Sequence, residues 1–262
     1  MRRLAPTAVP FLAALAVTAA AVAAAFALPL PAQALTITIG GDGGTEFVAG
    51  SGKEVAIARK IGSFSELRVD SSVDVTAHQG SGQAVTVHAD DNIEPMIETV
   101  VEGDALVIRM KKGKNFHTRH KVVVDVEFTT LTATRQHASG DLRITSISGP
   151  RLESSIAGSG DLQIDNAKLG SFSVSVAGSG DVAISGSADD ARFAVAGSGD
   201  IDAAHFAARR VSVSISGSGD ARLNASESLD ARVAGSGDVT YTGHPKDVSR
   251  RVSGSGSIEA DD

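Results

Sequence analysis

The second half of the chain repeats the tetrapeptide Gly-Ser-Gly-Asp at nearly constant spacing, and this repeat limits the possible folds more than any other feature. Five copies are complete and two are degenerate. Their aspartates, or the serine that replaces the last one, stand at positions 141, 161, 181, 200, 220, 238 and 257. Successive copies are therefore 18 to 20 residues apart. Seven evenly spaced copies of one unit are typical of a solenoid built from stacked coils.

Apolar residues recur at fixed places in each unit. Counted from the aspartate, they stand one and three residues after it and five and nine residues before it, with Gln136 as an exception in the first copy. Mostly polar or small residues alternate with them, which is the period of a half-buried β-strand. We therefore expect two short strands of about four to six residues in each unit. Equivalent strands of successive units should stack into one continuous core.

The length of the unit selects among the repeat folds. Twenty extended residues have a contour of roughly 66 Å, which suits one coil of a β-solenoid. A propeller blade needs about 40 residues, a leucine-rich repeat needs a helical or 3₁₀ segment, and the calcium-binding β-helix has a period of about nine. The repeat therefore predicts an all-β fold, a parallel β-helix-like solenoid with coils of about 20 residues.

The tetrapeptide itself predicts a corner of the coil. If the chain stays extended there, both glycines point inward, where coils approach closely, and the serine and aspartate point outward. Stacked aspartates about 4.8 Å apart repel one another, so something must offset the repulsion. One reading is a hydrogen bond from each carboxylate to a backbone N–H; the other is a row of bound Ca²⁺ ions. The candidate calcium ligands are Asp161, Asp181, Asp200, Asp220 and Asp238.

Residues 1–34 have the pattern of a secretory signal peptide. Arg2 and Arg3 precede an apolar run over 11–30, and Ala32-Gln33-Ala34 is a cleavage site. The run could also span a bilayer as a retained anchor. We expect cleavage before Leu35 and no membrane span in the mature chain. The intact mass of the exported protein checks this, since a chain that keeps residues 1–34 would indicate an anchor instead.

The mature chain divides by pattern into three parts. Residues 35–55 are Gly-rich and predict a first strand up to Ile39 followed by a flexible lead-in. Residues 56–130 alternate and predict the strand-rich N-terminal part of the solenoid, with 92–101 ambiguous between a short helix and an irregular strand. Residues 131–262 hold the repeat coils, so 56–262 should form one continuous domain.

Composition excludes several functions. The chain has no Cys, which rules out disulfides, a thiol nucleophile, a Cys-bound zinc or iron–sulfur site and a lipidated cysteine. Its net charge of -7 argues against a nucleic-acid partner. One basic cluster stands out as a candidate site for an anionic glycan or a lipid head group, although a solvated loop would explain it as well. Its members are Lys111, Lys112, Lys114, Arg119 and Lys121.

Catalytic and metal-binding patterns are weak. Two carboxylates about 5 Å apart would resemble the pair of a retaining glycosidase, but an aspartate present in nearly every coil is explained by the coil. His117 and His120 could offer imidazoles to a metal, and a solvated loop is the simpler interpretation. We therefore expect no catalytic residues and no cofactor, with Ca²⁺ as the one candidate ion.

The final repeat departs from the others. Arg250 stands where earlier copies have an apolar residue, Arg251 follows it, and Ser257 replaces the aspartate. A solenoid end exposes unpaired backbone groups that invite stacking. We expect these charged residues to oppose uncontrolled end-to-end stacking of the chains.

The chain also resembles a known family, the auto-transporter adhesin head GIN domain, over about residues 56–260. The matching segments are 64–69 (FSELRV), 103–108 (GDALVI), the repeated Ala/Ser-Gly-Ser-Gly-Asp and the closing 234–245 (AGSGDVTYTGHP). The resemblance implies a secreted bacterial protein with a right-handed parallel β-helix-like fold.

These observations lead to one functional expectation and one alternative. We expect an exported, non-enzymatic, adhesin-like or envelope surface module, in the periplasm, on the outer surface or outside the cell. Its partners would be surface glycans or envelope components, and a homo-oligomer fits the repeat. The alternative is a polysaccharide-active lyase or hydrolase on a β-helix scaffold, which would need an irregular cluster of carboxylates or arginines.

Overall fold

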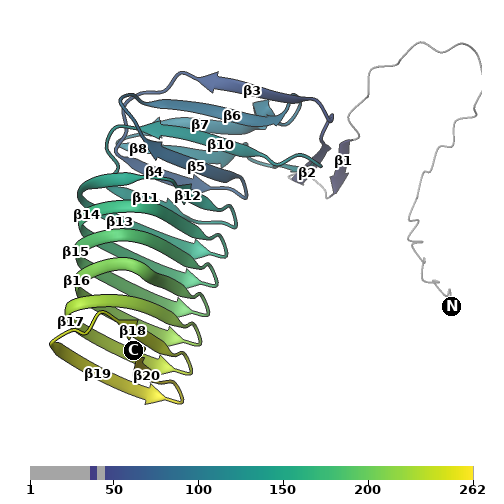
Figure 1. Ribbon diagram of the computed structural model, residues 1–262. Coiled ribbons are helices and arrows are strands. Elements are labelled where there is room, and N and C mark those ends of the chain that lie inside the picture. Colours follow the sequence, from purple (N-terminus) through teal and green to yellow (C-terminus); the bar gives the residue numbers. More distant parts are fainter. Residues whose placement is uncertain (1–35, 40–44, 262) are drawn as a thin grey trace, which may run out of the picture. The chain divides into compact units, whose positions relative to one another are not determined.

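The computed structural model describes residues 36–39 and 45–261, so the predicted signal peptide, 1–34, lies outside the described residues. Almost every described segment is a strand, and the only helical one is a 3₁₀ turn at Glu94–Met96. Figure 1 shows the repeat coils stacked in sequence order, each beside the next. The prediction of an all-β solenoid with coils of about 20 residues is confirmed.

Each complete coil is one long bent strand, not two short ones. These strands are β14 (Leu162–Gly178), β15 (Val182–Gly197), β16 (Ile201–Gly217) and β17 (Ala221–Gly235). The expected length of four to six residues was therefore wrong. Because equivalent residues of neighbouring coils lie in register, parallel pairing continues around the bends. It is interrupted by register shifts at 164–167, 183–186, 202–207 and 208–210.

Incomplete coils flank the long strands. The first consists of β11 (Ala133–Gln136), and β12 (Leu142–Ile144) and β13 (Ile147–Gly158) follow it. At the other end, β18 (Val239–Thr242), β19 (Asp247–Gly254) and β20 (Ile258–Ala260) form the last coils. β19 pairs with β17, and β20 pairs with β18, both in parallel.

The predicted apolar rows form the core. The positions one residue after the aspartate and five before it are buried in the inner coils. Three phenylalanines also fill the interior, and their rings pack edge to face. Phe172 lies 5.9 Å from Phe193 and 5.8 Å from Phe206 between ring centroids. In the last coil Ile258 stays buried, but Val252, five residues before Ser257, and Val248, nine before it, are 45% and 39% exposed.

Both glycines of the motif approach the preceding coil closely, since a Cβ on Gly178 would lie 2.1 Å from the carbonyl oxygen of Gly158, and the first glycine has a further constraint. The first has a positive φ, for example 143° at Gly178, which L side chains rarely adopt. The second is buried, and a Cβ built on Gly180 would lie 2.3 Å from the carbonyl oxygen of Gly160 in the preceding coil. The first glycine is only half-buried, so the prediction that both point inward holds for the second alone. The atoms that would clash with a side chain at these glycines belong to the backbone of the preceding coil.

Residues 56–130 continue the solenoid walls with short strands, some of them antiparallel, in place of regular coils. One wall runs from β13 and β11 through β4 (Glu66–Asp70) and β8 (Ala105–Met110) to antiparallel β7 (Ile97–Glu102). The other runs from β12 through β5 (Asp74–Gln79) and β10 (Val123–Phe128) to antiparallel β6 (Ala84–Asp90) and β3 (Glu54–Arg59). This part lacks the 20-residue repeat, so its chain order could not be predicted from spacing.

The Gly-rich lead-in is more ordered than expected. β1 (Thr36–Ile39) pairs with β2 (Thr45–Ala49), and β2 pairs in parallel with β9 (Lys114–His117). The ambiguous stretch 92–101 contains both predicted alternatives, because the 3₁₀ turn Glu94–Met96 leads directly into β7.

An arginine side chain closes each end of the core. Arg59 forms an ion pair of 2.5 Å with Glu94 and donates to the backbone oxygens of Glu94 and Ile97. Arg250 lies over the ring of Tyr241 at 5.0 Å and hydrogen-bonds its hydroxyl. Each arginine therefore covers the last apolar layer of the core with its side chain and keeps its charged group hydrogen-bonded.

Candidate functional site

The repeated aspartates form a hydrogen-bonded row that we call the aspartate ladder. In it, one carboxylate oxygen accepts the backbone N–H of the equivalent residue in the following coil, at 2.7 to 3.1 Å. This arrangement matches the first reading of the motif, in which backbone N–H groups offset the repulsion between carboxylates. The members of the ladder are Asp74, Asp141, Asp161, Asp181, Asp200, Asp220, Asp238 and Ser257.

Both ends of the ladder have distinct chemistry. Asp74 begins it outside the Gly-Ser-Gly-Asp repeat, and Lys121 lies 3.0 Å from its carboxylate. Ser257 ends it, donating both its N–H and its hydroxyl to Asp238. Sequence reasoning missed Asp74, and the only signal was the short Ser71-Ser72-Val73-Asp74 segment, which lacks both glycines.

We expect Asp181→Ala to lower the free energy of unfolding by about 1 kcal/mol more than Asp181→Asn. The asparagine keeps an acceptor for the N–H of Asp200, whereas alanine removes it. Urea unfolding of the two variants checks this. Melting curves in EDTA and in Ca²⁺ should coincide for the unchanged chain. A calcium-dependent rise in its melting temperature that Asp181→Asn abolishes would contradict a purely structural ladder.

The ladder carboxylates are spread along the stack and do not converge. Over residues 36–39 and 45–261, the structure contains no group of three or more His, Asp or Glu side chains placed to hold a metal ion. Calcium binding by Asp161, Asp181, Asp200, Asp220 and Asp238 stays a prediction, which the melting curves above test.

The basic cluster is spread over separate places. Lys111 and Lys112 lie exposed after β8, and Lys111 faces a hollow that it shares with Arg59 and Arg109. Lys114 pairs with Glu46, and Lys121 pairs with Asp74 at the head of the ladder. Arg119 lines a different hollow, beside His120. The structure therefore does not bring the five side chains together into one site.

His120 has a specific partner, the buried carboxylate of Asp90. Its Nδ1 lies 2.7 Å from one oxygen of Asp90, and the Thr118 hydroxyl donates to the other at 2.7 Å. Burial works to raise the pKa of Asp90, but the hydrogen bonds from His120, Thr118 and the Gly52 N–H outweigh it and lower that pKa. The hydrogen bond to Asp90 raises the pKa of His120.

This pair makes stability depend on pH. The contribution of His120 is complete below its ordinary pKa of 6.5 and is lost as pH rises through the raised value. The contribution of Asp90 is complete above 3.8 and is lost as pH falls through the lowered value. We therefore expect His120→Gln to cost most stability between about pH 4 and 6.5. Urea midpoints against pH check this, with exposed His117→Gln as the control; parallel profiles for the two variants would contradict it.

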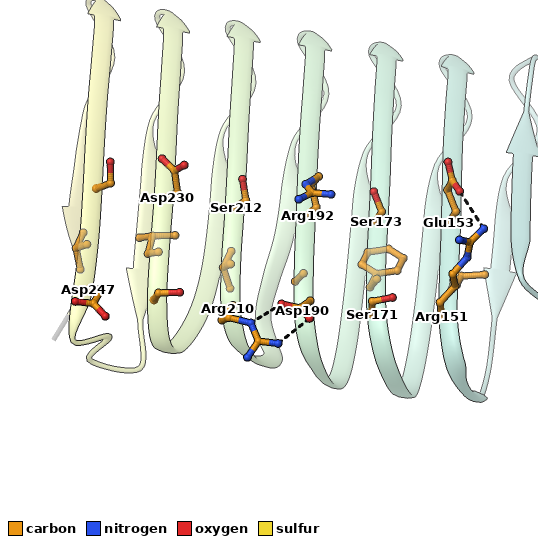
Figure 2. A pocket seen from close by; sticks show the side chains of 18 of the residues that line it. Arg151, Glu153, Ser171, Ser173, Asp190, Arg192, Arg210, Ser212, Asp230 and Asp247 are labelled. Carbon is orange, nitrogen blue, oxygen red and sulfur yellow. Dashed lines mark hydrogen bonds and ion pairs between the residues drawn. The ribbon is translucent and has the colours of Figure 1, made fainter.

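A groove of about 1200 Å³ lies across β13, β14, β15, β16, β17 and β19. Figure 2 shows that its polar side chains come from equivalent places in successive coils, so that they line up across the strands. They are the residues ten and eight places before each aspartate, with the apolar residue nine places before it between them. The ten labelled ones are Arg151, Glu153, Ser171, Ser173, Asp190, Arg192, Arg210, Ser212, Asp230 and Asp247.

Charged pairs alternate with hydroxyl groups along this groove. Arg210 binds both oxygens of Asp190, at 2.6 and 2.7 Å, and Arg151 lies 3.6 Å from Glu153 (Figure 2). The hydrogen bond from Arg210 lowers the pKa of Asp190, which makes this carboxylate an acceptor and a poor proton donor. Within the described part of the chain, Arg192 has no ion-pair partner. Such a groove can hydrogen-bond a polar ligand along its length.

Sequence reasoning described the rows of this groove but did not identify it as a site. A comparison with protein families matches residues 63–245 to the family described as "putative auto-transporter adhesin, head GIN domain". The chain belongs to this family. The resemblance noted from the repeated motif is therefore confirmed over most of the predicted range.

Solved structures with the same architecture are similar to this chain. A putative adhesin of Bacteroides fragilis NCTC 9343 is 26% identical, with a TM-score of 0.76, over 81% of this chain and 99% of that one. A putative lipid binding protein of Parabacteroides distasonis ATCC 8503 is 28% identical, with a TM-score of 0.69, over 82% and 100%. No protein with a curated description matches the chain.

The family and these neighbours indicate an exported or surface-associated module of the adhesin type. Their descriptions are those of adhesins and of a lipid-binding protein, which suggests a non-enzymatic role. No helix in the described residues is long and apolar enough to cross a membrane.

Proposed function

We propose that the protein is a non-enzymatic surface module that binds extended glycan chains along the groove of β13–β17 and β19. The observation that carries the proposal is the groove itself, which crosses six strands and repeats its polar rows from coil to coil. A repeated ligand fits a surface repeated at about 4.8 Å. Hydroxyl, guanidinium and carboxylate groups are suitable donors and acceptors for sugar hydroxyls.

The Arg210–Asp190 pair favours binding over turnover. A hydrolase needs a carboxylic acid that can donate a proton, whereas Arg210 lowers the pKa of Asp190 and keeps it ionised. A polysaccharide lyase or hydrolase is the alternative function, and a lipid ligand is a further outcome because one structural neighbour is described as a lipid-binding protein.

A glycan array probed with the mature chain, with and without Ca²⁺, tests the proposal. Arg192→Glu should weaken the array signal about tenfold, a loss of ~1.4 kcal/mol, because it reverses the charge of an exposed groove arginine without an ion-pair partner among the described residues. Arg222→Glu is the matched control, since Arg222 is exposed on β17 outside the groove.

Three results would overturn glycan binding in the groove. Equal losses in the two variants would place the ligand elsewhere. Release of reducing ends or unsaturated sugars from a bound polysaccharide would favour the enzyme. Binding to phospholipid vesicles with an empty array would favour a lipid ligand.

A further inference from the structure

The last coil presents a strand edge that has no partner within residues 36–39 and 45–261. β19 pairs with β17 along one edge only. Every residue of β19 except Ser249 is exposed, and Val248 and Val252 are two of the four large apolar side chains that the described chain exposes. An edge of this kind can accept another strand.

The pairing of β19 with β17 determines which backbone groups are free. Ser255 donates its N–H to Gly235 at 2.9 Å, and Glu153, the equivalent of Ser249 in an earlier coil, likewise donates to the preceding segment. Backbone groups alternate sides along a strand. The N–H and C=O groups of Val248, Arg250 and Val252 therefore point toward the open edge.

The side chains on the outer face of β19 have complementary charges at symmetric distances. Asp247 stands two residues before Ser249, and Arg251 stands two residues after it. Arg251 forms one long ion pair, with 3.9 Å between its guanidinium nitrogen and a carboxylate oxygen of Asp230. Within the described residues Asp247 has no ion-pair partner. A second β19 running antiparallel, centred on Ser249, would place each Asp247 opposite an Arg251.

We propose that this edge binds a second copy of the chain, forming a two-fold dimer in which the two β19 strands pair antiparallel about Ser249. In this register the free backbone groups of Val248 face those of Arg250 in the second copy. The Asp247–Arg251 pairs fall at the non-hydrogen-bonded positions, where opposite side chains approach more closely. Cross-strand pairs of opposite charge stabilise such a pairing, and like charges oppose it.

Charge also opposes a neighbouring register, the one centred on Arg250. A shift by one residue in each strand would place Arg250 opposite Arg250 and Asp247 opposite the uncharged Ser253. A two-fold contact uses the same surface on both copies and closes, so the dimer would not grow into a fibre. Since Asp247 and Ser249 also line the groove, the dimer would bring two grooves end to end. The dimer does not depend on what the groove binds.

Sedimentation of the mature chain over a range of concentrations tests the proposal. We expect a dimer of the unchanged chain, and a fall to the mass of one chain for Asp247→Arg and for Arg251→Asp. In each variant like charges meet twice. A mixture of the two variants should dimerise again, because every Asp247→Arg chain then offers arginines to the aspartates of an Arg251→Asp chain. This recovery also shows that both variants are folded.

Lys168→Asp is the control, because it makes the same change of charge at an exposed position of β14. It should stay dimeric. A monomeric unchanged chain at every concentration would overturn the proposal, and so would dimers of both single variants or a mixture that stays monomeric.

Discussion

Gly180→Val and Gly199→Val are expected to lower the free energy of unfolding by about 1–3 kcal/mol or more, whereas Ser179→Val should change it by no more than about 0.5 kcal/mol. A Cβ on Gly199 would lie 2.1 Å from the carbonyl oxygen of Gly180. That oxygen belongs to the backbone of the preceding coil, at the corner between the paired strands β14 and β15, which hold it in place. Ser179 lies between the two glycines of its motif and points into solvent.

Urea unfolding of the three variants gives the comparison directly. Ser179→Val is the matched control, because it adds the same side chain one residue from Gly180. Equal unfolding midpoints for the glycine and serine variants would show that the coils can separate locally to admit a side chain. In that case the close approach at the motif would not limit its sequence.

Phe172→Ala is expected to cost about 3–5 kcal/mol, which is the largest effect we anticipate for a single residue. Phe172 is 1% exposed and contacts both Phe193 and Phe206 edge to face. Alanine would leave a cavity between three coils whose backbones are held in register, so the core cannot collapse to fill it.

Phe172→Leu should recover a large part of the loss, because it restores apolar volume without the ring. Phe47→Ala is the control for the loss of a benzyl group, since Phe47 is 38% exposed on β2. Thermal or urea unfolding measures all three. A cost of less than about 1 kcal/mol for Phe172→Ala would mean that the coils repack around the missing ring.

The repeat predicted the interior of the coils well because each position is constrained several times. Ile156, Val176 and Val195 occupy one buried row, so a single misleading residue could not change the reading. Gln136 interrupts that row as the one exception. It is buried, and its amide donates to the backbone oxygens of Gly140 and Asp161 at 3.2 and 2.9 Å.

Other features could not be predicted because they depend on contacts between distant segments. Asp74 joins the aspartate ladder although 67 residues separate it from Asp141. The antiparallel pairing of β6 with β3 and with β10 joins strands that are not consecutive in the chain, which alternation alone does not specify. The length of the strands was misjudged because alternating residues do not show whether hydrogen bonding continues through a bend.

The groove shows the same limit at the candidate site. The sequence predicted that the rows of this groove are polar. It did not predict the concave surface, which forms because six strands bend at the same place. The basic cluster shows the converse. Lys114 and Lys121 are close in sequence, yet each pairs with an acidic residue of a different strand, and the expected site is divided.

The aspartate ladder also sets a direction along the molecule. Each carboxylate accepts the backbone N–H of the coil that comes next in the chain. A folded coil therefore already presents the hydrogen-bond acceptor that the following coil needs. A chain that emerges from its amino-terminal side can therefore add one coil at a time, each closing a loop of only about 20 residues. Assembly of this kind would need no contact with residues still to be made, which suits a chain delivered through a narrow export channel.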